Sequence, residues 1–387
     1  MKKLYRAAAV IAAIALSVAV CSCVGQENRK NHYKQFYAMG TVATLLVPQT
    51  VCSEEQFAQL SSDMSAMLYS ADSSLSTMIE TSDIYKFNEA DAGEKVPIDK
   101  TAYDVLFIAK KMYDFTNGFY NPAVYHSVKA FGFPLWSNAP TLPSEQKIEA
   151  FRDLASHFGE LELTQENGKY YAAKPGYTVT VEGVKYSLAV DLGGIGKGWC
   201  ADRVDEMLSS RGYEYGYFDF SSSSMAVKRY YHNGSNSYSI EPRDPRGNYG
   251  DDGLGSVWIK DVNLSTSGDY EQYYELDNGD GTKTRYCHII NPTTGMPIRT
   301  GVASVTVIGG SAAEDDALTT ALSCMDKQTA VDFINGKLSD KIIIMLVLEG
   351  DKGEIITNRP EELNKINSKY ALGNRVENGR IVLNDVA

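Results

Sequence analysis

Residues 191–202 of the chain read Asp-Leu-Gly-Gly-Ile-Gly-Lys-Gly-Trp-Cys-Ala-Asp, so that glycines surround a single lysine, Lys197. An apolar stretch, residues 186–190, precedes this run and an amphipathic segment follows it, a pattern that predicts a strand, a tight turn and a helix. Glycines let the backbone approach a ligand closely, and the N-terminus of a helix attracts anions. The run therefore indicates a site for a nucleotide phosphate.

Two familiar phosphate-binding motifs do not fit this run. A Walker loop needs glycine where Asp191 stands and serine or threonine where Gly198 stands. The dinucleotide fingerprint Gly-x-Gly-x-x-Gly fails as well, because Gly194, Gly196 and Gly198 alternate. A purely structural role, in which the glycines let a helix pack closely on a sheet, explains the run alone equally well.

The composition restricts the class of protein. With 387 residues, 43% of them apolar, the chain can bury one large core or two medium ones. The formal net charge is −12, and it becomes about −15 without the three basic residues near the N-terminus. Nucleic acid is therefore not an expected partner.

The N-terminus has the pattern of a secretory signal. Three basic residues precede an apolar run over residues 7–20, which is too short and wrongly flanked for a stable membrane span. The ending resembles a bacterial lipoprotein cleavage box with Ser22 before the cut and Cys23 as the lipidated residue. Cys21 is the weaker candidate, because Val20 would then fill the small site. An ordinary cleaved signal with incidental cysteines is the alternative.

This pattern predicts an exported protein, lipid-anchored to a bacterial membrane on the periplasmic side. We expect a signal and lipidation box over residues 1–23, a polar tether over 24–34 and a catalytic domain over 35–387. The remaining cysteines stand far apart without a Cys-x-x-Cys pair, so neither a zinc site nor a disulfide framework is indicated and buried free thiols are expected. They are Cys52, Cys200, Cys287 and Cys324.

Apolar periodicity and helix-capping residues predict the secondary structure. The expected elements are a strand over 37–48, helices over 53–71, 101–116 and 144–157, three short strands before the glycine run, a helix after it that ends at Gly212, strands within 213–290, a strand over 302–307 and a helix over 312–325. A polar insertion, residues 232–253, is expected to be a surface loop. Grouped strands without βαβ alternation predict an α+β fold, with mixed or antiparallel sheets flanked by helices, in one compact domain of one or two lobes.

Residues 316–320, Asp-Ala-Leu-Thr-Thr, lie within the last of these helices. The i, i+4 spacing places the Asp316 carboxylate and the Thr320 hydroxyl on one face, as two oxygen ligands for a hard cation. Mg²⁺ would keep waters and take its other contacts from substrate phosphates and a backbone carbonyl. The structural alternative is an acid that complements the helix dipole and a threonine bonded to its own turn.

His288 opens the run His-Ile-Ile-Asn-Pro-Thr-Thr-Gly-Met-Pro. A strand that ends in a histidine before an Asn-Pro turn places the imidazole at the mouth of a loop, where it can titrate near neutral pH and act as a base. A buried, hydrogen-bonded structural histidine is the alternative. His32 and His232 lie in expected surface segments, and the setting of His126 and His157 decides nothing.

Seven segments, in this order, resemble the FAD:protein FMN transferase (ApbE) family of flavin-transferring lipoproteins. They are Met-Gly-Thr at 39–41, Leu-Ser-Thr-Met-Ile-Glu-Thr-Ser-Asp-Ile-Tyr-Lys-Phe-Asn at 75–88, Gly-Phe-Tyr-Asn-Pro-Ala at 118–123, the run 191–202, Thr-Ser-Gly-Asp-Tyr at 266–270, residues 288–297 and residues 313–321. Together they extend over nearly the whole mature chain.

The resemblance implies an enzyme that splits FAD, leaves FMN esterified through its phosphate to a threonine of an exported or membrane-bound flavoprotein, and releases AMP. The residues implied to contact FAD are Met39, Met78, Phe119, Tyr120, Asn121, Asp191, Lys197, Ser267 and Ala303. Those implied to hold Mg²⁺ are Asp316, Thr320, the adjacent Thr319 and the backbone carbonyl of Gly194.

This chemistry fits the residues. Cleavage of a pyrophosphate by a hydroxyl group needs charge neutralisation and a base. Mg²⁺ and Lys197 would supply the positive charge, and His288 would take the proton from the acceptor threonine.

The chain departs from the family pattern in three ways. Asn121 and Asn291 stand where the family commonly has aspartate, and Met78 where it commonly has an aromatic residue. Residues 218–225, Phe-Asp-Phe-Ser-Ser-Ser-Ser-Met, replace a strand end that usually carries two glycines, and they add hydroxyl donors. We expect weaker orientation at the asparagines and altered flavin geometry at the serines, more than a change at the metal site.

Two other functions use the same residues. A non-catalytic FAD-binding lipoprotein would store or present FAD at the membrane, and an FAD pyrophosphatase would use water in place of threonine and give FMN and AMP. His288, Asp316 and Thr320 favour catalysis over storage. Transfer or hydrolysis then depends on whether an acceptor loop can dock.

Overall fold

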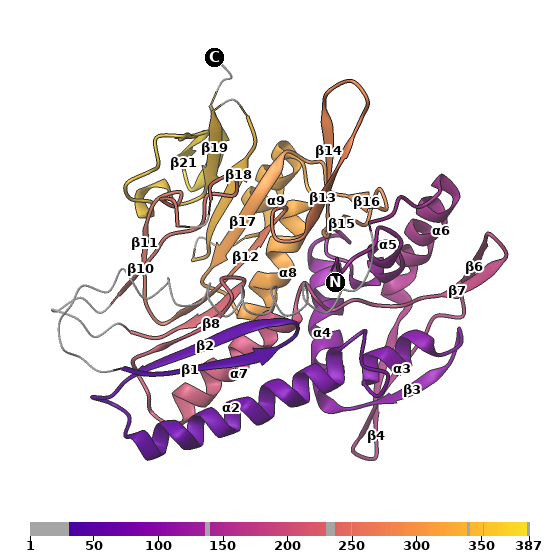
Figure 1. The fold of residues 1–387 in the computed structure, drawn as a ribbon, viewed down its shortest axis with the longest axis horizontal. Coiled ribbons are helices and arrows are strands. Elements are labelled where there is room, and N and C mark those ends of the chain that lie inside the picture. The colour runs from indigo at the N-terminus through magenta and orange to yellow at the C-terminus, as the bar shows by residue number, and fades with distance from the viewer. Residues whose placement is uncertain are drawn as a thin grey trace, which may run out of the picture.

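A nine-stranded sheet forms the centre of the computed structural model, which describes residues 31–135, 140–229, 237–248, 250–338, 341–350 and 352–384 (Figure 1). In order across the sheet the strands are β1 (Asn31–Ala38), β2 (Thr41–Pro48), β8 (Tyr217–Phe220), β9 (Ser224–Val227), β12 (Val262–Gly268), β17 (Val302–Ile308), β18 (Ile343–Leu348), β19 (Gly353–Thr357) and β20 (Tyr370–Leu372). Neighbouring strands are antiparallel, except that β19 and β20 are parallel. The predicted α+β fold with a mixed sheet is confirmed.

Smaller elements surround this sheet. The helices are α2 (Glu54–Leu75), α3 (Asp83–Glu89), α4 (Lys100–Phe115), α5 (Tyr125–Ala130), α6 (Glu145–Ser156), α7 (Gly196–Ser210), α8 (Ala312–Ser323) and α9 (Lys327–Lys337), with 3₁₀ turns at Pro122–Val124, His157–Glu160 and Pro360–Glu362. The other strands are β3 (Lys95–Ile98), β5 (Lys169–Ala173) and β4 (Glu162–Glu166) in one sheet, and the pairs β6 (Thr178–Val181) with β7 (Val184–Ser187), β10 (Tyr238–Ile240) with β11 (Val257–Ile259), β13 (Tyr273–Asp277) with β14 (Lys283–Cys287), β15 (Ile290–Asn291) with β16 (Met296–Pro297), and β21 (Asn374–Glu377) with β22 (Arg380–Leu383).

The central strands are apolar because both faces of the sheet are covered. Successive residues of a strand point to opposite faces. On β18, Ile344 and Leu346 join the larger core, which includes residues of α7 and α8, whereas Met345 and Val347 join a second core that includes residues of β11. Helices α7 and α8 pack against β9, β12 and β17. Packing on the sheet thus sets the position of these two helices, including their N-terminal ends.

The predicted helices begin and end near their expected residues. Ser53 caps α2 in a capping box with Gln56, and Ser144 caps α6. Gly118 follows α4 with a φ of 82°, as expected for a residue that ends a helix. The helices predicted over 53–71, 101–116, 144–157 and 312–325, and the four buried free thiols, are confirmed.

The strand predicted over residues 37–48 is two strands. β1 and β2 form a hairpin in which Ala38 pairs with Thr41, and Met39 and Gly40 make the turn. Both turn residues have positive φ, 49° and 74°, which fits the twist of a tight hairpin. The prediction was wrong because the apolar pattern continues through the turn and methionine is not a usual turn residue.

The sheet also begins earlier than expected. Residues 31–34, assigned to the tether, belong to β1 because they pair with the end of β2. The predicted signal, the lipidation site Cys23 and the rest of the tether lie outside the described residues. Among the helices that are described, none has the length and apolar character needed to cross a bilayer.

Residues 188–190 are buried but do not continue β7, contrary to prediction. Instead the Asn88 side chain replaces a neighbouring strand: its Nδ2 donates to the Val190 carbonyl and its Oδ1 accepts the Val190 N–H, both at 2.8 Å. The buried Lys174 ammonium donates to the Asn88 carbonyl at 2.9 Å. The start of the glycine run is therefore tied to the C-terminal end of α3.

The polar insertion, residues 232–253, is not simply a surface loop. It contains β10, which pairs with β11. Asp244 is buried, accepts the Arg246 N–H at 2.8 Å and accepts a hydrogen bond from the Tyr370 hydroxyl. The surface-loop prediction was wrong because polarity alone does not show that such side chains satisfy one another inside the fold.

Ser221 and Ser222 make the turn between β8 and β9 with φ values of 50° and 59°. This left-handed conformation favours glycine, so the serines keep the kind of turn that the two family glycines would make. The Ser221 hydroxyl lies 2.8 Å from Thr41 Oγ1 and also donates to the Val42 carbonyl. It therefore joins the tips of two hairpins.

We predict that Ser222→Gly raises the free energy of unfolding by about 0.5–1 kcal/mol, because glycine adopts the left-handed conformation without the steric cost that serine has. Ser221→Gly gives the same relief but loses the contacts to Thr41 and Val42, so its gain should be smaller. Urea unfolding of both variants measures the difference. A less stable Ser222→Gly variant would contradict the assignment of strain to this turn.

Candidate active site

The glycine run forms a tight turn that leads into α7. Asp191 fixes this turn, because its N–H donates to the Pro122 carbonyl and its Oδ1 accepts the Gly193 N–H, both at 2.8 Å. Lys197 Nζ donates to the Gly193 carbonyl at 3.3 Å. Burial raises the pKa of Asp191, although the Gly193 N–H and the Lys197 ammonium lower it. The predicted turn is confirmed, and it contacts the predicted segment 118–123.

Helices α7 and α8 meet at their N-terminal ends. A Cβ atom on Gly198 would lie 2.2 Å from the Ala312 carbonyl oxygen, so a larger residue cannot be accommodated there. Asp202, further along α7, accepts the N–H groups of Ala312 and Ala313 at 2.6 and 3.0 Å. Its carboxylate therefore caps α8. The packing role that we considered for the glycines is confirmed at Gly198.

Three of the residues expected to hold a metal lie together beneath the turn. The Asp316 carboxylate is 2% exposed and accepts the Gly198 N–H at 3.1 Å. A Cβ atom on Gly194 would lie 2.9 Å from Thr320 Oγ1, which places the Gly194 backbone directly against that hydroxyl. Segments more than 100 residues apart in the chain thus bring a carboxylate, a hydroxyl group and the Gly194 backbone to one place.

These donors fit a hard cation. Mg²⁺ prefers oxygen ligands and keeps several waters. Burial raises the pKa of Asp316, although Lys197 and the Gly198 N–H lower it, so a bound cation would stabilise the ionised carboxylate. In the part of the chain that the structure describes, no group of three or more His, Cys, Asp and Glu residues is placed to hold a metal. Substrate oxygens and water would therefore have to complete the coordination.

The two threonines also show the structural alternative. The hydroxyl groups of Thr319 and Thr320 donate to the Asp316 carbonyl at 2.8 and 3.2 Å. Ser267 Oγ lies 2.8 Å from Thr319 Oγ1 and 3.5 Å from Thr320 Oγ1. A hydroxyl that donates to the backbone keeps lone pairs for a cation, so the two roles are compatible.

The Tyr120 hydroxyl has no hydrogen-bond partner among the described residues, although the side chain is only 2% exposed. Burial, and then the charges of Asp316 and Asp191, raise the pKa of Tyr120 well above its usual value. The hydroxyl therefore stays protonated and can donate. Because an unsatisfied buried hydroxyl costs about 1–3 kcal/mol, it marks a place for a bound oxygen atom, such as that of a phosphate or a water.

Lys197 links the parts of the site electrostatically. Its ammonium group lowers the pKa values of Asp191, Asp316 and His288, which come from three distant parts of the chain. Such effects weaken with distance, so all three groups lie around this one charge. The structure thus brings the glycine turn, the late helix and the histidine run to a single site.

His288 lies between β14 and β15, and its ring faces Phe133 edge-on at 6.4 Å. Its Nδ1 is 3.3 Å from the Gln272 carbonyl oxygen, which also accepts the His288 N–H at 3.0 Å. A carbonyl can only accept, so Nδ1 carries the proton and Nε2 has a free lone pair.

Burial, and then the Lys197 ammonium, lower the pKa of His288 to about 4. The expectation that it titrates near neutral pH was therefore wrong, because the loop mouth is less exposed than the sequence indicates. The imidazole is neutral at pH 7 and is already in the form that accepts a proton.

The two asparagines have structural roles. Asn121 Nδ2 donates to the Ala155 carbonyl at 2.9 Å and its Oδ1 accepts the Ala123 N–H at 2.9 Å. Asn291 Nδ2 donates to the Cys324 carbonyl at 2.9 Å, and its Oδ1 accepts the Thr293 N–H at 2.9 Å. A carboxylate could not donate to these carbonyls, so each amide has a structural role here, while the expected weaker orientation and the contact of Asn121 with FAD stay predictions.

The other residues expected to contact FAD differ in their setting. A Cβ atom on Gly196 would lie 3.6 Å from Met39 Cε, so Met39 covers the glycine turn. Phe119 packs against the apolar cluster beside His288. The Ala303 carbonyl accepts the Asp269 N–H at 3.1 Å, and Met78 is 51% exposed between α2 and α3.

The sequence analysis did not identify three residues that support the site. Ser224 is buried beside Asp316, where it lowers the pKa of that carboxylate, and it accepts a hydrogen bond from Ser265 at 3.0 Å. Asp202 caps α8, and Asn88 holds the start of the turn. In the sequence these residues are marked by their position alone, because each is the last residue of a segment: Asp202 of the glycine run, Asn88 of residues 75–88 and Ser224 of the serine run.

The chain is similar to known proteins over most of its length. The sequence model of the ApbE family matches residues 39–345. The FAD:protein FMN transferase of Treponema pallidum (strain Nichols) is 25% identical over 312 residues, which are 78% of this chain and 81% of that protein. The protein of the same name from Escherichia coli (strain K12) is 25% identical over 332 residues, 81% of this chain and 83% of the relative.

Solved structures share the fold. The ApbE protein of Thermotoga maritima has a TM-score of 0.68 and 27% sequence identity, with 84% of this chain and 96% of that chain covered. The apo form of the flavinyl transferase ApbE from Pseudomonas stutzeri has a TM-score of 0.67 at 22% identity, with 85% and 94% covered. The family match covers most of the sequence, and the segments that make the site lie within it. The chain therefore belongs to the ApbE family.

Proposed function

We propose that this ApbE-family transferase moves the FMN half of FAD to a threonine hydroxyl of an exported flavoprotein, with Mg²⁺ as its metal and AMP as the second product. Relatives named FAD:protein FMN transferase support FAD as the flavin donor and a protein as the acceptor. The observation that carries the proposal is that the glycine turn around Lys197 lies against the buried Asp316 carboxylate and the Thr320 hydroxyl. Beside them the buried Tyr120 hydroxyl has no hydrogen-bond partner among the described residues.

The chain's own groups account for binding of the pyrophosphate. Lys197 supplies positive charge, and the N-terminal end of α7 adds a partial positive charge of its own. The Tyr120 hydroxyl can donate to a phosphate oxygen. Gly194, Asp316 and Thr320 would hold Mg²⁺, which when bound neutralises charge on phosphate oxygens.

His288 is the general base of the proposed reaction. Its Nε2 takes the proton as the threonine oxygen bonds to the phosphorus of the FMN half, and the bond from that phosphorus to the bridging oxygen breaks. The bridging oxygen and its electron pair leave with AMP. The Nδ1–H bond to the Gln272 carbonyl supports the imidazolium that forms.

Hydrolysis and storage are the competing functions. Water in the place of threonine would give FMN and AMP from the same groups. A carrier that only stores FAD has no need of a base, so the neutral imidazole of His288 favours catalysis. The predicted lipid anchor at Cys23 would hold the enzyme at the periplasmic side of a bacterial membrane, beside membrane-bound acceptors; this part of the proposal comes from the leader sequence alone.

We predict that residues 26–387, incubated with FAD, Mg²⁺ and an exported flavoprotein domain, increase the intact mass of that domain by one FMN. His288→Ala should bind FAD but transfer FMN about 10²–10⁴-fold more slowly, because it lacks the base. Free FMN and AMP without a mass increase would indicate hydrolysis, and intact bound FAD would favour a carrier. Full transfer by His288→Ala would remove the role assigned to that residue.

Asp316→Asn should raise the Mg²⁺ concentration needed for half-maximal transfer by about tenfold or more, because it removes the charged ligand. The matched control is Glu314→Gln on the same helix, where the carboxylate pairs with Lys111 at the surface. A titration of activity with Mg²⁺ measures both. If Asp316→Asn has the metal dependence of the unmodified enzyme, Asp316 has only a structural role.

The pH dependence of kcat/KM should show an acid limb well below pH 6.5. His288 acts as a base only when neutral, and its pKa is about 4, so activity is lost as the pH falls through that value. Lys197→Met removes a charge that disfavours the imidazolium, and the limb should move up toward 6.5. Lys197→Arg keeps the positive charge, so its acid limb should stay at the low pH of the unmodified enzyme. A limb that does not move in Lys197→Met would contradict the electrostatic link.

A further inference from the structure

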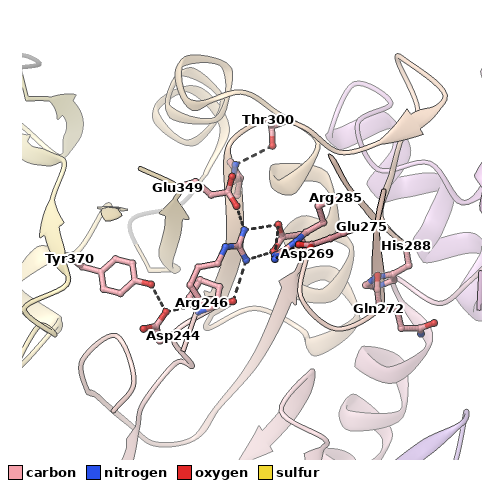
Figure 2. Close-up of polar contacts among 12 residues, drawn as sticks. Asp244, Arg246, Asp269, Gln272, Glu275, Arg285, His288, Thr300, Glu349 and Tyr370 are labelled. Atoms are coloured by element: carbon pink, nitrogen blue, oxygen red, sulfur yellow. Dashed lines mark hydrogen bonds and ion pairs between the residues drawn. The ribbon is translucent and has the colours of Figure 1, made fainter. Parts of the chain in front are cut away.

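A group of ion pairs around the buried Asp269 lies near His288 and has no part in the mechanism above (Figure 2). Arg246 binds both carboxylate oxygens of Asp269, Nη1 to Oδ1 and Nη2 to Oδ2, each at 2.7 Å. Asp269 is 8% exposed, and Arg285 Nη1 lies 3.7 Å from its Oδ2. A buried carboxylate thus depends mainly on one two-pronged contact with Arg246.

The Arg246 guanidinium is fixed from its other side as well. Its Nη2 also bonds the Glu349 carboxylate, and its Nη1 donates to the Pro245 carbonyl at 3.2 Å. The Arg246 N–H donates to the buried Asp244, which the Tyr370 hydroxyl holds in turn. Figure 2 shows this sequence of contacts extending from Tyr370 to Asp269. Arg246 is exposed, but the contacts on both sides of its guanidinium restrict its position.

Asp269 is close in sequence to the group that orients the imidazole. Its N–H donates to the Ala303 carbonyl of β17 at 3.1 Å. Three residues later, the Gln272 carbonyl accepts both the N–H and the Nδ1–H of His288. The segment 269–272 is thus anchored at one end by Arg246 and Ala303, and it holds His288 at the other.

We propose that Arg246 is a positioning residue for His288: it fixes Asp269 and, through the segment 269–272, keeps the Gln272 carbonyl against Nδ1. Without this contact the ring could exchange tautomers, and Nε2 would carry the proton for part of the time. An imidazole in that form cannot accept a proton at Nε2. The kinetic test of this inference rests on the proposed function, whereas the NMR test does not.

Arg246 also neutralises a charge that acts on His288. The charged groups around the imidazole are Lys197 of α7, which lowers its pKa, and Asp269 after β12, which raises it. With Arg246 removed, the cation that Asp269 keeps among the described residues is the more distant Arg285 on β14, and the negative charge of Asp269 acts more strongly on the ring. Arg246→Met and Asp269→Asn should therefore move the protonation of His288 in opposite directions.

Nitrogen NMR of the histidine side chains tests the proposal without any activity. The His288 signals are identified by their loss in His288→Gln. In the unmodified protein we expect His288 to carry its proton on Nδ1 and to become doubly protonated only far below pH 6.5. In Arg246→Met we expect a mixture of the two His288 tautomers, and double protonation at a higher pH. In Asp269→Asn, His288 should be protonated at a still lower pH than in the unmodified protein. The matched control is Glu349→Gln, which removes another partner of Arg246 but keeps the contact with Asp269.

The kinetic readout follows from the same argument. Arg246→Met should lower kcat for FMN transfer about tenfold, less than the 10²–10⁴-fold that loss of the base itself would cause, with KM for FAD unchanged. Arg246→Lys should recover part of the rate, because it keeps the charge but loses the planar fork. If Arg246→Met does not fold, Arg246→Lys carries the NMR test, with mixed tautomers of His288 expected because the two-pronged contact is lost, and a smaller change in protonation because the charge is kept.

An unchanged tautomer and an unchanged protonation of His288 in the Arg246 variants would overturn the proposal. Failure of the unmodified enzyme to transfer FMN would instead refute the proposed function and leave the NMR result valid. An equal loss of activity in Glu349→Gln would also count against the proposal, because that variant keeps the Arg246–Asp269 contact.

Discussion

The close approach of α7 to α8 at Gly198 determines the geometry of the site. The absent side chain lets the α7 backbone meet the Ala312 carbonyl, and Asp202 then caps α8 from the same helix. Because the Gly198 N–H binds the Asp316 carboxylate, this contact also sets the position of Asp316 relative to Gly194. The sheet on which α7 and α8 pack fixes the positions of both helices. A methyl group at residue 198 would therefore disturb the fold and the chemistry together.

The fold class, the helices and the main site were largely predictable from the sequence because their signals are local. Ser53 and Ser144 mark helix starts by their capping chemistry, and the glycine run marks a turn by its backbone freedom. The errors came from contacts between distant residues. Val190 pairs with the Asn88 side chain and Asp244 with Tyr370, and neither partner can be found by periodicity. The acidity of His288 likewise depends on burial that only the folded chain provides.

Structural and chemical interpretations of the same residue proved compatible at this site. Gly198 packs two helices, yet its N–H also binds Asp316. The Thr320 hydroxyl bonds to its own turn while it lies against Gly194. Asn121 and Asn291 donate to the carbonyls of Ala155 and Cys324 at helix ends, which an ionised aspartate could not do. Several residues of this family member therefore have a structural contact and a contact within the site at the same time.

The base and the phosphate-binding groups are supported by different parts of the molecule. His288 follows the hairpin of β13 and β14, which is not part of the nine-stranded sheet, whereas Lys197 and Asp316 lie on helices packed against that sheet. Side-chain contacts, such as the apolar cluster around Phe119, join the two parts. The position of the base therefore depends on these side-chain contacts and not on the strand pairing of the main sheet. A substitution in the hairpin packing would therefore displace the partly buried imidazole of His288 while the nine-stranded sheet stayed paired.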